Sequence, residues 1–374
     1  MKHFQAGRLV QQAHYKSFQP NPIHRAWVMD DMALLQLLGQ ADRELGRLDM
    51  YSEYIPNIDL FIRMHVLKEA TQSSRIEGTQ TNIEEALLEK EDVALERRDD
   101  WEEVQNYVAA MNEAVDKLRK LPFSARLIRE THKTLMQGVR GRHKQPGEFR
   151  HSQNWIGGAS INDAVFVPPV HGSIAALISD IEQFVHDEQR HFPELLKIAL
   201  VHYQFETIHP FLDGNGRVGR LLITLYLVSK GILKQPVLYL SDFFERNRQL
   251  YYDNLMRVRD KNDLLQWFKF FLVGVIETAR SSTTTFDNIL KLQKQVESQL
   301  QTLGSRTANA QKVMYYLYQR PVVNAAKVAE AAGVSPASAY KLIADLERFG
   351  ILKEVTGGRR SRMYVFDAYL KLFS

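Results

Sequence analysis

The chain has 374 residues, a length sufficient for two or three domains. Of these residues 45% are hydrophobic and 25% charged, a composition typical of a globular protein. It contains no cysteine, which excludes disulfides, thiolate metal sites and cysteine nucleophiles. The sequence shows neither an apolar leader nor an unbroken apolar run of membrane-spanning length. We therefore expect a cytoplasmic protein without a membrane partner.

The formal net charge of +4 is unevenly distributed along the chain. Residues 309–374 hold ten Lys and Arg against five Asp and Glu, whereas residues 1–308 hold 38 against 39. The basic excess belongs to the C-terminal segment alone. This asymmetry predicts a separate module that is open to a polyanionic partner.

Helical patterns begin after residues 1–55, which are irregular and contain scattered proline. Apolar residues recur at helical spacing from Asp59 to Ser74, and Gly78 can take the left-handed conformation that ends a helix. Thr81 and Asn82 predict the N-cap of a second helix, IEEALLEKE. A charged segment follows it, and then a longer helix that runs through Leu118.

A β-hairpin is predicted within residues 146–169. Two short β-prone runs, 154–156 and 164–167, flank a connection rich in Gly, Ser and Asn. Helices resume from Ile174 to Val185, and another begins after Pro193, because proline is tolerated in a first helical turn. The hairpin is therefore an isolated β element in a helical region.

Two amphipathic helices, 251–279 and 284–303, are predicted before Gly304 and Ser305 interrupt the pattern. The main domain boundary is placed at this interruption. These signals divide the chain into a helical N-terminal region, a core, a linker helix and a C-terminal domain, at residues 1–120, 121–280, 281–308 and 309–374. The expected fold class is mostly α.

The C-terminal domain has the order of a winged helix-turn-helix. Helices are predicted at 310–319 and 324–332, and a third begins at Ser335 with Pro336 in its first turn. Such modules bind DNA in many proteins and serve others as interaction or dimerisation platforms, so DNA binding and a homodimer both stay open. The final hairpin has arginines at its tip: Arg359, Arg360 and Arg362.

The stretch from His209 to Arg220, HPFLDGNGRVGR, combines a base, a carboxylate, three glycines and two arginines directly before an apolar helix. Glycines let a backbone approach a ligand closely, and a helix start offers free N–H groups to phosphate. Arg217 and Arg220 are three residues apart, so they are expected to share a helix face and bind phosphate oxygens. The stretch predicts an anion-binding loop.

Two side chains of this loop suggest the chemistry. Asp213 is its one acid, and Mg²⁺ prefers one or two carboxylates together with phosphate oxygens. His209 has a reference pKa of ~6.5, so it is largely neutral in the cytoplasm and can accept a proton from an attacking hydroxyl. Base, metal and anion site together predict nucleotidyl or phosphoryl transfer.

The twelve residues resemble in full the HPFxDGNGRxxR signature of the Fic (filamentation induced by cAMP) domain family. The segments FRHSQNWIGG, FVPP and LYLSDFFERNRQLYYDNLMRVR extend the resemblance over most of the chain. It implies an all-helical core with a β-hairpin flap. It also implies transfer of AMP from ATP to a Ser, Thr or Tyr hydroxyl of a protein, the chain itself included.

The resemblance implies a role for each matching residue. His209 is the base, Asp213 binds Mg²⁺, Phe211 anchors the loop and Tyr251 lies beside the adenine. The implied phosphate site consists of Gly214, Asn215, Gly216, Arg217, Val218, Gly219 and Arg220. The implied flap, which holds an extended target segment by strand pairing, includes Asn154, Trp155, Ile156 and Gly157.

The segment SSRIEG resembles the inhibitory motif of the same family, in which Ser or Thr precedes Glu by four positions and Gly or Asn follows. Here these positions are Ser73, Glu77 and Gly78. The resemblance implies that Glu77 pairs with Arg220, the arginine meant for the γ-phosphate. Unit charges about 4 Å apart attract by roughly 4 kcal/mol at an effective dielectric of 20, less after desolvation, and ~1.4 kcal/mol is a factor of ten. We therefore expect a self-inhibited enzyme.

Two alternatives stay open. One is a DNA-binding transcriptional regulator whose nucleotide site acts as a sensor. The other is a different reaction on the same loop, either phosphoryl transfer or removal of AMP. Retention of label from the α-phosphate or from the γ-phosphate of ATP distinguishes these interpretations.

Overall fold

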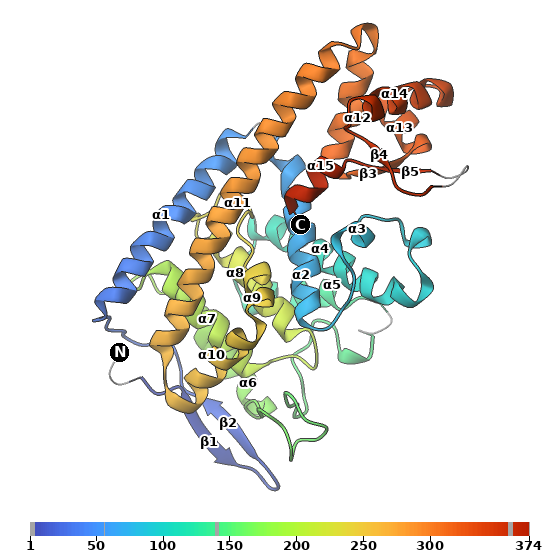
Figure 1. The fold of residues 1–374 in the computed structure, drawn as a ribbon. Coiled ribbons are helices and arrows are strands. Elements are labelled where there is room, and N and C mark those ends of the chain that lie inside the picture. The colour runs from blue at the N-terminus through green and yellow to red at the C-terminus, as the bar shows by residue number, and fades with distance from the viewer. Residues whose placement is uncertain (1–3, 56, 139–141, 358–361, 374) are drawn as a thin grey trace.

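The protein is described by a computed structural model that covers residues 4–55, 57–138, 142–357 and 362–373. Helices dominate it, and α1 and α11 lie side by side along one edge of the molecule (Figure 1). Short 3-10 turns connect several of the elements. In chain order these are β1 (Gly7–Gln11), β2 (Lys16–Pro20), α1 (Met32–Tyr54), α2 (Ile58–Ile76), α3 (Ile83–Ala86), α4 (Arg98–Leu118), α5 (Ala125–Leu135), α6 (Ile174–His186), α7 (Glu194–Ile208), α8 (Asn215–Ser229), α9 (Ser241–Arg246), α10 (Arg248–Lys261), α11 (Leu264–Gln301), α12 (Thr307–Gln319), β3 (Val322–Asn324), α13 (Ala325–Ala332), α14 (Pro336–Arg348), β4 (Lys353–Glu354), β5 (Met363–Val365) and α15 (Asp367–Leu370).

The N-terminal region is more regular than the sequence predicted. β1 and β2 form an antiparallel hairpin, and the 23-residue helix α1 follows it. Asp31 caps α1 by accepting a hydrogen bond from the backbone of Leu34 at 2.7 Å. The expectation of an irregular start was wrong although the pattern was present, because apolar residues recur at helical spacing and face α11. These are Leu34, Leu38, Ala41, Leu45 and Leu48.

The next three helices agree with the predicted order, with one difference in length. α2 ends before Gly78, whose φ of +104° is the left-handed conformation expected there. Asn82 caps α3 as predicted, but α3 stops at Ala86 and 3-10 turns replace the rest of the predicted helix. α4 runs through Leu118 as expected.

The predicted helix boundary near residue 280 is wrong. α11 continues from Leu264 to Gln301 without a break, and the interruption lies at Asn262 instead, whose φ is +57°. The run of Ser and Thr at 281–285 is compatible with the helix, because the Thr284 hydroxyl donates to the carbonyl of Arg280 at 3.0 Å. Packing of α1 along α11 also favours one continuous helix.

The C-terminal unit, residues 307–373, contains α12, α13 and α14 and a three-stranded antiparallel sheet in the order β3-β5-β4. Its predicted helix signals are confirmed. Ser335 caps α14 with Pro336 in the first turn, and Gly333 has a φ of +67°. Arg359 and Arg360 lie outside the described residues, and Arg362 lies 3.9 Å from a carboxylate oxygen of Glu354.

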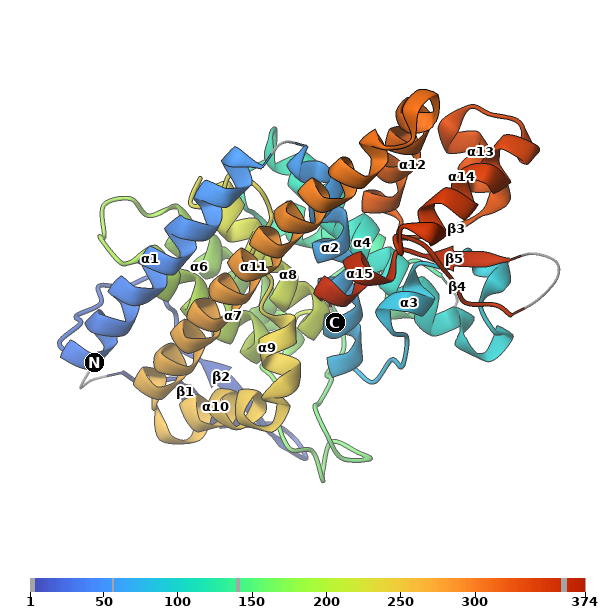
Figure 2. The ribbon, with the colours of Figure 1, turned by 45° about the horizontal axis from the view of Figure 1, so that its top comes forward.

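This unit packs against the N-terminal half of α2. The ring of Phe61 meets Tyr318 edge-on at 5.5 Å between centroids and lies 6.4 Å from Tyr369. One turn later, His65 lies against Phe286 of α11 and Phe373 near the C-terminus. Figure 2 shows α15 and the C-terminus beside α2. Helix α2 therefore contacts both the C-terminal unit and the core.

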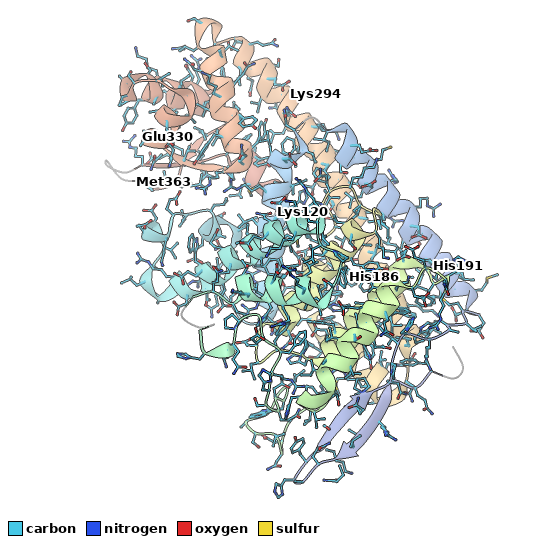
Figure 3. The ribbon with its side chains drawn as sticks, turned by 180° about the vertical axis from the view of Figure 1, so that it is seen from behind. Lys120, His186, His191, Lys294, Glu330 and Met363 are labelled. Atoms are coloured by element: carbon cyan, nitrogen blue, oxygen red, sulfur yellow. The ribbon has the colours of Figure 1, made fainter. Side chains whose placement is uncertain are left out.

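The view from behind shows the two ends of the molecule (Figure 3). Lys294 of α11 and Glu330 and Met363 of the C-terminal unit lie at one end, while His186 and His191 lie nearer the other. In the described part of the chain, none of the helices combines the length and apolar character that crossing a bilayer demands.

We expect Phe61→Ala to lower the free energy of unfolding by ~3–5 kcal/mol, because it empties a buried site between α2 and two aromatic rings. Urea unfolding measures this change, with Leu9→Ala on the exposed face of β1 as the control, whose effect should stay within about 0.5 kcal/mol. Equal midpoints for the two variants would contradict the packing described above.

Candidate active site

The loop between α7 and α8 is held in a defined conformation by its own residues. α7 ends at His209, whose φ of +49° is left-handed and whose N–H donates to the carbonyl of Phe205 at 2.9 Å. Gly214, at φ +75°, begins α8. Asn215 fixes the turn between them, because its side chain accepts from Phe211 N at 2.8 Å and donates to Phe211 O at 2.9 Å.

Phe211 anchors the loop in the core as expected, and its main partner is His132. The two rings are stacked 3.7 Å apart. Nδ1 of His132 lies 2.8 Å from the backbone N of Gly147 and Nε2 lies 3.1 Å from the carbonyl of Asp213. Burial lowers the pKa of His132 to about 4, so the neutral ring accepts at Nδ1 and donates at Nε2. No role was predicted for His132, which supports the loop through its contacts with Phe211 and Asp213.

A buried arginine joins the loop to the segment before the flap. Arg150 donates to the carbonyl of His209 at 2.9 Å, that of Ser152 at 3.0 Å and that of Pro169 at 2.6 Å. Asn154, which the resemblance implies for the target-binding flap, donates to the carbonyl of Phe211 at 3.0 Å. Both side chains therefore position the loop.

His209 borders a cavity of about 510 Å³, within the range of ~300–1,000 Å³ common for ligand pockets. Burial, assisted by the positive charge of Arg259, lowers the pKa of His209 to about 4. Its Nδ1 has no hydrogen-bond partner among the described residues. A neutral imidazole at neutral pH is able to accept a proton. The cavity is lined by Glu77, Trp155, Ile156, Gly157, Val165, Phe166, Glu206, His209, Gly216, Arg220, Tyr251, Tyr252, Leu255, Met256 and Arg259.

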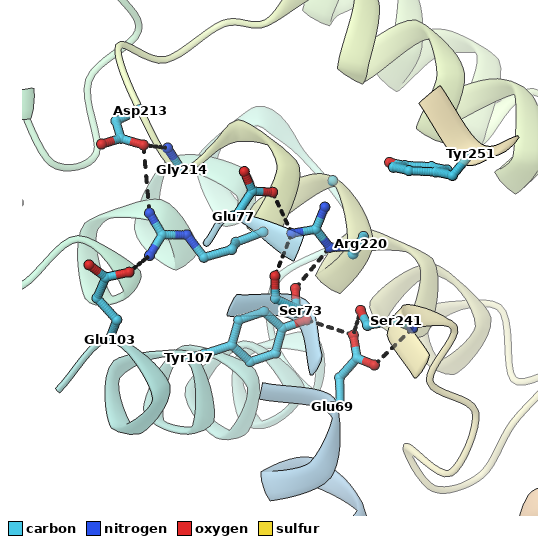
Figure 4. Close-up of polar contacts among 12 residues, drawn as sticks. Glu69, Ser73, Glu77, Glu103, Tyr107, Asp213, Gly214, Arg220, Ser241 and Tyr251 are labelled. Carbon is cyan, nitrogen blue, oxygen red and sulfur yellow. Dashed lines mark hydrogen bonds and ion pairs between the residues drawn. The ribbon is translucent and has the colours of Figure 1, made fainter. Parts of the chain in front are cut away.

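Within this cavity Arg220 is bound by the end of α2 (Figure 4). Its guanidinium lies 2.6 Å from Oε1 of Glu77 and donates to both the hydroxyl and the carbonyl of Ser73, each at 2.9 Å. Burial alone would raise the pKa of Glu77, but the charge and the hydrogen bond of Arg220 outweigh burial and lower it. The ion pair that the resemblance implies is present.

Gly216 provides the space for this ion pair. A Cβ at this position would overlap with Oε1 of Glu77 and lie 3.0 Å from the guanidinium of Arg220. The carboxylate of Glu77 therefore lies over the first turn of α8, where free N–H groups favour an anion. A carboxylate therefore fills the space beside the start of α8.

Arg217 points to a different partner from Arg220. Its guanidinium lies 2.8 Å from Oε2 of Glu103 on α4 and 3.6 Å from Oδ1 of Asp213. The two arginines thus meet different elements, although they were expected to act on one face. Oδ1 of Asp213 also accepts from Gly214 N at 2.6 Å, and the side chain of Asp213 is 46% exposed.

Comparison with known proteins identifies the family. The Fic/DOC family N-terminal model matches residues 35–116, and the Fic/DOC family model matches residues 122–227. The chain is a Fic domain protein. The second match contains the α7–α8 loop, and the first contains α2 with Ser73 and Glu77.

Individual relatives are similar over part of the chain. Protein adenylyltransferase Fic of Aedes aegypti is 34% identical over 125 residues, which are 33% of this chain and 22% of the relative. Its namesake in Drosophila grimshawi is 31% identical over 157 residues, or 41% of this chain and 29% of the relative. The matched part of this chain thus spans less than a third of each of these relatives.

Solved structures share the fold at low sequence identity. A Fic family protein from Desulfovibrio desulfuricans G20 has a TM-score of 0.59 at 19% identity, with 91% of this chain and 98% of that chain covered. Fic-1 from C. elegans has a TM-score of 0.51 at 20% identity, with 70% and 75% covered. These matches support the fold of the Fic domain and of most of the chain.

A buried carboxylate that the sequence did not reveal fixes α2 against α4 and α9. Glu69 lies one turn before Ser73 and accepts from the Tyr107 hydroxyl at 2.9 Å and from the Ser241 hydroxyl at 2.5 Å and backbone at 3.1 Å. These bonds connect α2 with α4 and α9 (Figure 4). They thereby position Ser73 and Glu77 against Arg220.

Of the residues that the resemblance implies for adenine and target, Tyr251, Trp155, Ile156 and Gly157 line the cavity, and Asn154 does not. Tyr251 is buried, stacks on Phe244 at 4.5 Å and shares a hydrogen bond of 2.9 Å with His202, so it forms part of the wall. The predicted hairpin is reduced to a single antiparallel bridge between Ile156 and Phe166.

Trp155 and Gly157 border the same cavity. Trp155 is exposed at its rim. Gly157 has a φ of +68°, and a Cβ there would lie 2.7 Å from the side chain of Val165. A larger residue at position 157 would push the two arms of the segment apart.

Glu206 is a second carboxylate near Arg220, and the sequence analysis missed it. Its side chain is buried, its Oε1 has no hydrogen-bond partner among the described residues, and burial raises its pKa to about 7. Gly219 accommodates it, since a Cβ there would overlap with the carboxyl group. A glutamate in the apolar run of α7, three residues before His209, was the available signal.

The raised pKa of Glu206 predicts a pH-dependent stability. The folded chain keeps this proton up to about pH 7, whereas the unfolded chain loses it near 4.5, so the free energy of unfolding falls as the pH rises between these values. In Glu206→Gln this fall should be smaller. Urea unfolding of both proteins from about pH 5 to pH 8 measures the difference, and parallel curves would refute it.

Proposed function

We propose that this chain is a protein adenylyltransferase that moves AMP from ATP to a Ser, Thr or Tyr hydroxyl of a protein, itself included. The observation that carries this proposal is His209, which is half-buried at the edge of the cavity, is kept neutral by its lowered pKa, and begins a loop that leads to Arg220. The relatives named protein adenylyltransferase Fic support it at family level.

The side chains suggest how the reaction proceeds. His209 accepts the proton of the incoming hydroxyl while the hydroxyl oxygen attacks the α-phosphorus of ATP. The bond from the α-phosphorus to the bridging oxygen of the β-phosphate breaks, and pyrophosphate leaves. General-base catalysis of this kind contributes about 10²–10⁴ in rate. The N–H groups at the start of α8 and Arg220 stabilise the phosphates.

Asp213 is the residue that would hold Mg²⁺. Its carboxylate is half exposed beside the start of α8, and no group of three or more His, Asp or Glu able to bind a metal occurs among the described residues. This agrees with the preference of Mg²⁺ for one or two carboxylates plus substrate phosphates. When bound, the ion would neutralise phosphate charge.

Glu77 is proposed to inhibit the enzyme by occupying Arg220. The side chain of Arg220 is only 1% exposed, so its buried charge needs an anionic partner. Glu77 and the γ-phosphate would occupy the same position beside it, so they exclude one another. The overlap that a Cβ at Gly216 would have with Glu77 supports this competition, because the first turn of α8 is already occupied.

We expect Glu77→Gly to raise AMP transfer at least about tenfold, the effect of ~1.4 kcal/mol, because it leaves Arg220 to the nucleotide. Incorporation of ATP labelled at the α-phosphate into protein measures the gain. Glu84→Gly, on the exposed side of α3, removes an equal charge and should leave transfer unchanged. Equal labelling by wild type and Glu77→Gly would refute inhibition by Glu77.

In the Glu77→Gly background, His209→Ala should reduce labelling by at least about 10² because the base is lost. Binding of ATP, measured by titration calorimetry, should persist. His143→Ala, a surface histidine outside the cavity, is the control. Undiminished labelling without His209 would contradict adenylyl transfer by this mechanism.

The alternative reactions give different labelling. Retention of label from the γ-phosphate would favour phosphoryl transfer, and loss of label from protein that already carries AMP would favour removal of AMP.

The residues near Trp155 are proposed to bind the target. This segment has one bridge to its partner arm, so an extended segment of another protein is able to add a strand beside it. Such pairing uses backbone groups and is largely independent of target side chains.

The C-terminal unit is proposed to be a winged helix-turn-helix, and α14 with the β4–β5 hairpin would form its DNA-binding side. α14 exposes Ser338, Tyr340 and Lys341, which supports contact with a partner. Most described basic residues of the unit are paired with carboxylates, which favours a protein partner over DNA. They include Arg320, Lys327, Arg348, Arg362 and Lys371. DNA binding that ATP modulates, without labelling, would favour the regulator instead.

A further inference from the structure

Helix α1 has two glycines on its exposed face that the fold of the single chain does not require. A Cβ added at Gly39 or Gly46 would meet no atom within 4 Å. Both backbones are helical, without the positive φ that favours glycine. Each glycine destabilises an exposed helix by about 1 kcal/mol relative to alanine. Glycines on a helix face let a second helix approach closely.

Apolar side chains lie on the same face. Met32, Leu35 and Met50 are 71%, 41% and 48% exposed. Together with Gly39 and Gly46 they recur at intervals of three, four and seven residues, which places them on one stripe of the helix. The opposite face of α1 packs on α11, and α1 lies at the edge of the molecule in both Figure 1 and Figure 2. The stripe is therefore directed away from the core.

The two charges at the centre of the stripe have no ion-pair partner. Asp42 and Arg43 form no such pair within the described part of the chain, and burial by neighbouring groups raises the pKa of Asp42. The other charged side chains of α1 have partners within the chain. Glu44 pairs with Arg47 and Arg280, Asp49 accepts from the backbone of Lys234, and Glu53 pairs with the side chain of Lys234.

We propose that this stripe pairs with the same stripe of a second copy of the chain, antiparallel about a two-fold axis between Asp42 and Arg43. The stripe is self-complementary about this point. Asp42 faces the partner's Arg43, Gly39 faces the partner's Gly46, and Leu35 faces the partner's Met50. Each unpaired charge thereby gains an opposite charge, glycine meets glycine, and apolar meets apolar.

The geometry favours this register over others. The stripe from Met32 to Met50 is about 27 Å long at 1.5 Å per residue, and glycine at both close positions permits axes about 8 Å apart. A parallel pair would place Asp42 beside the partner's Asp42, where like charges repel. The described lining of the cavity includes no residue of α1, so substitutions on the stripe leave the proposed catalytic residues in place.

Cysteine cross-linking tests the register directly, since the chain has no natural cysteine. Under mild oxidation, the double variant Gly39→Cys with Gly46→Cys should form a covalent dimer, because each introduced thiol faces the other position in the partner. Either single variant should form little covalent dimer, because its thiol lies about 10 Å along the helix axis from the same thiol of the partner. Cross-linking of the single variants alone, or of none, overturns the proposal.

Charge exchange tests the contact at the axis. Sedimentation over a concentration series should show association of the wild type, at least tenfold weaker association for Asp42→Arg or Arg43→Asp, and recovery in the double variant. Asp116→Arg, at an exposed pair on α4, is the control. A wild type that stays monomeric throughout, or a double variant that does not recover, overturns the proposal.

The variant Gly46→Gln distinguishes a loss of association from misfolding. Glutamine is a better helix former than glycine, so the monomer should unfold at a higher temperature, whereas the larger side chain blocks close approach and should abolish association. Association that is unchanged in this variant overturns the proposal, because the glycine contact would then be absent.

Discussion

The guanidinium of Arg220 needs an anionic partner, and the arrangement of the site follows from that need. Its side chain is only 1% exposed, and an unpaired charge in such a place costs several kcal/mol. Ser73 and Glu77 satisfy it in this structure. Gly216 and Gly219 leave the space in which Glu77 and Glu206 approach it. The residues that would bind a nucleotide are thus the residues that hold α2.

Helix α2 connects distant parts of the molecule through this interaction. Its first turns pack on the C-terminal unit through Phe61 and His65, its middle is fixed by Glu69, and its end presents Glu77 to Arg220. A ligand that shifts the C-terminal unit would act on a helix already fixed at three points. The helix that carries Glu77 therefore also contacts the most basic part of the chain.

The sequence was most informative where signals are local. The His209–Arg220 loop, the caps of the C-terminal helices and the end of α2 at Gly78 were predicted from neighbouring residues and are present. The supports of the loop could not be predicted, because His132 and Arg150 reach it from distant segments. Helix continuity near residue 280 depended on packing against α1, and α1 itself showed an apolar pattern that was overlooked.

Competition for Arg220 is tested most directly by comparing nucleotides that differ in the γ-phosphate. Titration calorimetry with ATP and with ADP, in the presence of magnesium, should be carried out on the wild type and on Glu77→Gly. The substitution is expected to strengthen binding of ATP at least tenfold more than binding of ADP. An equal gain for both nucleotides, or no gain for ATP, would contradict it.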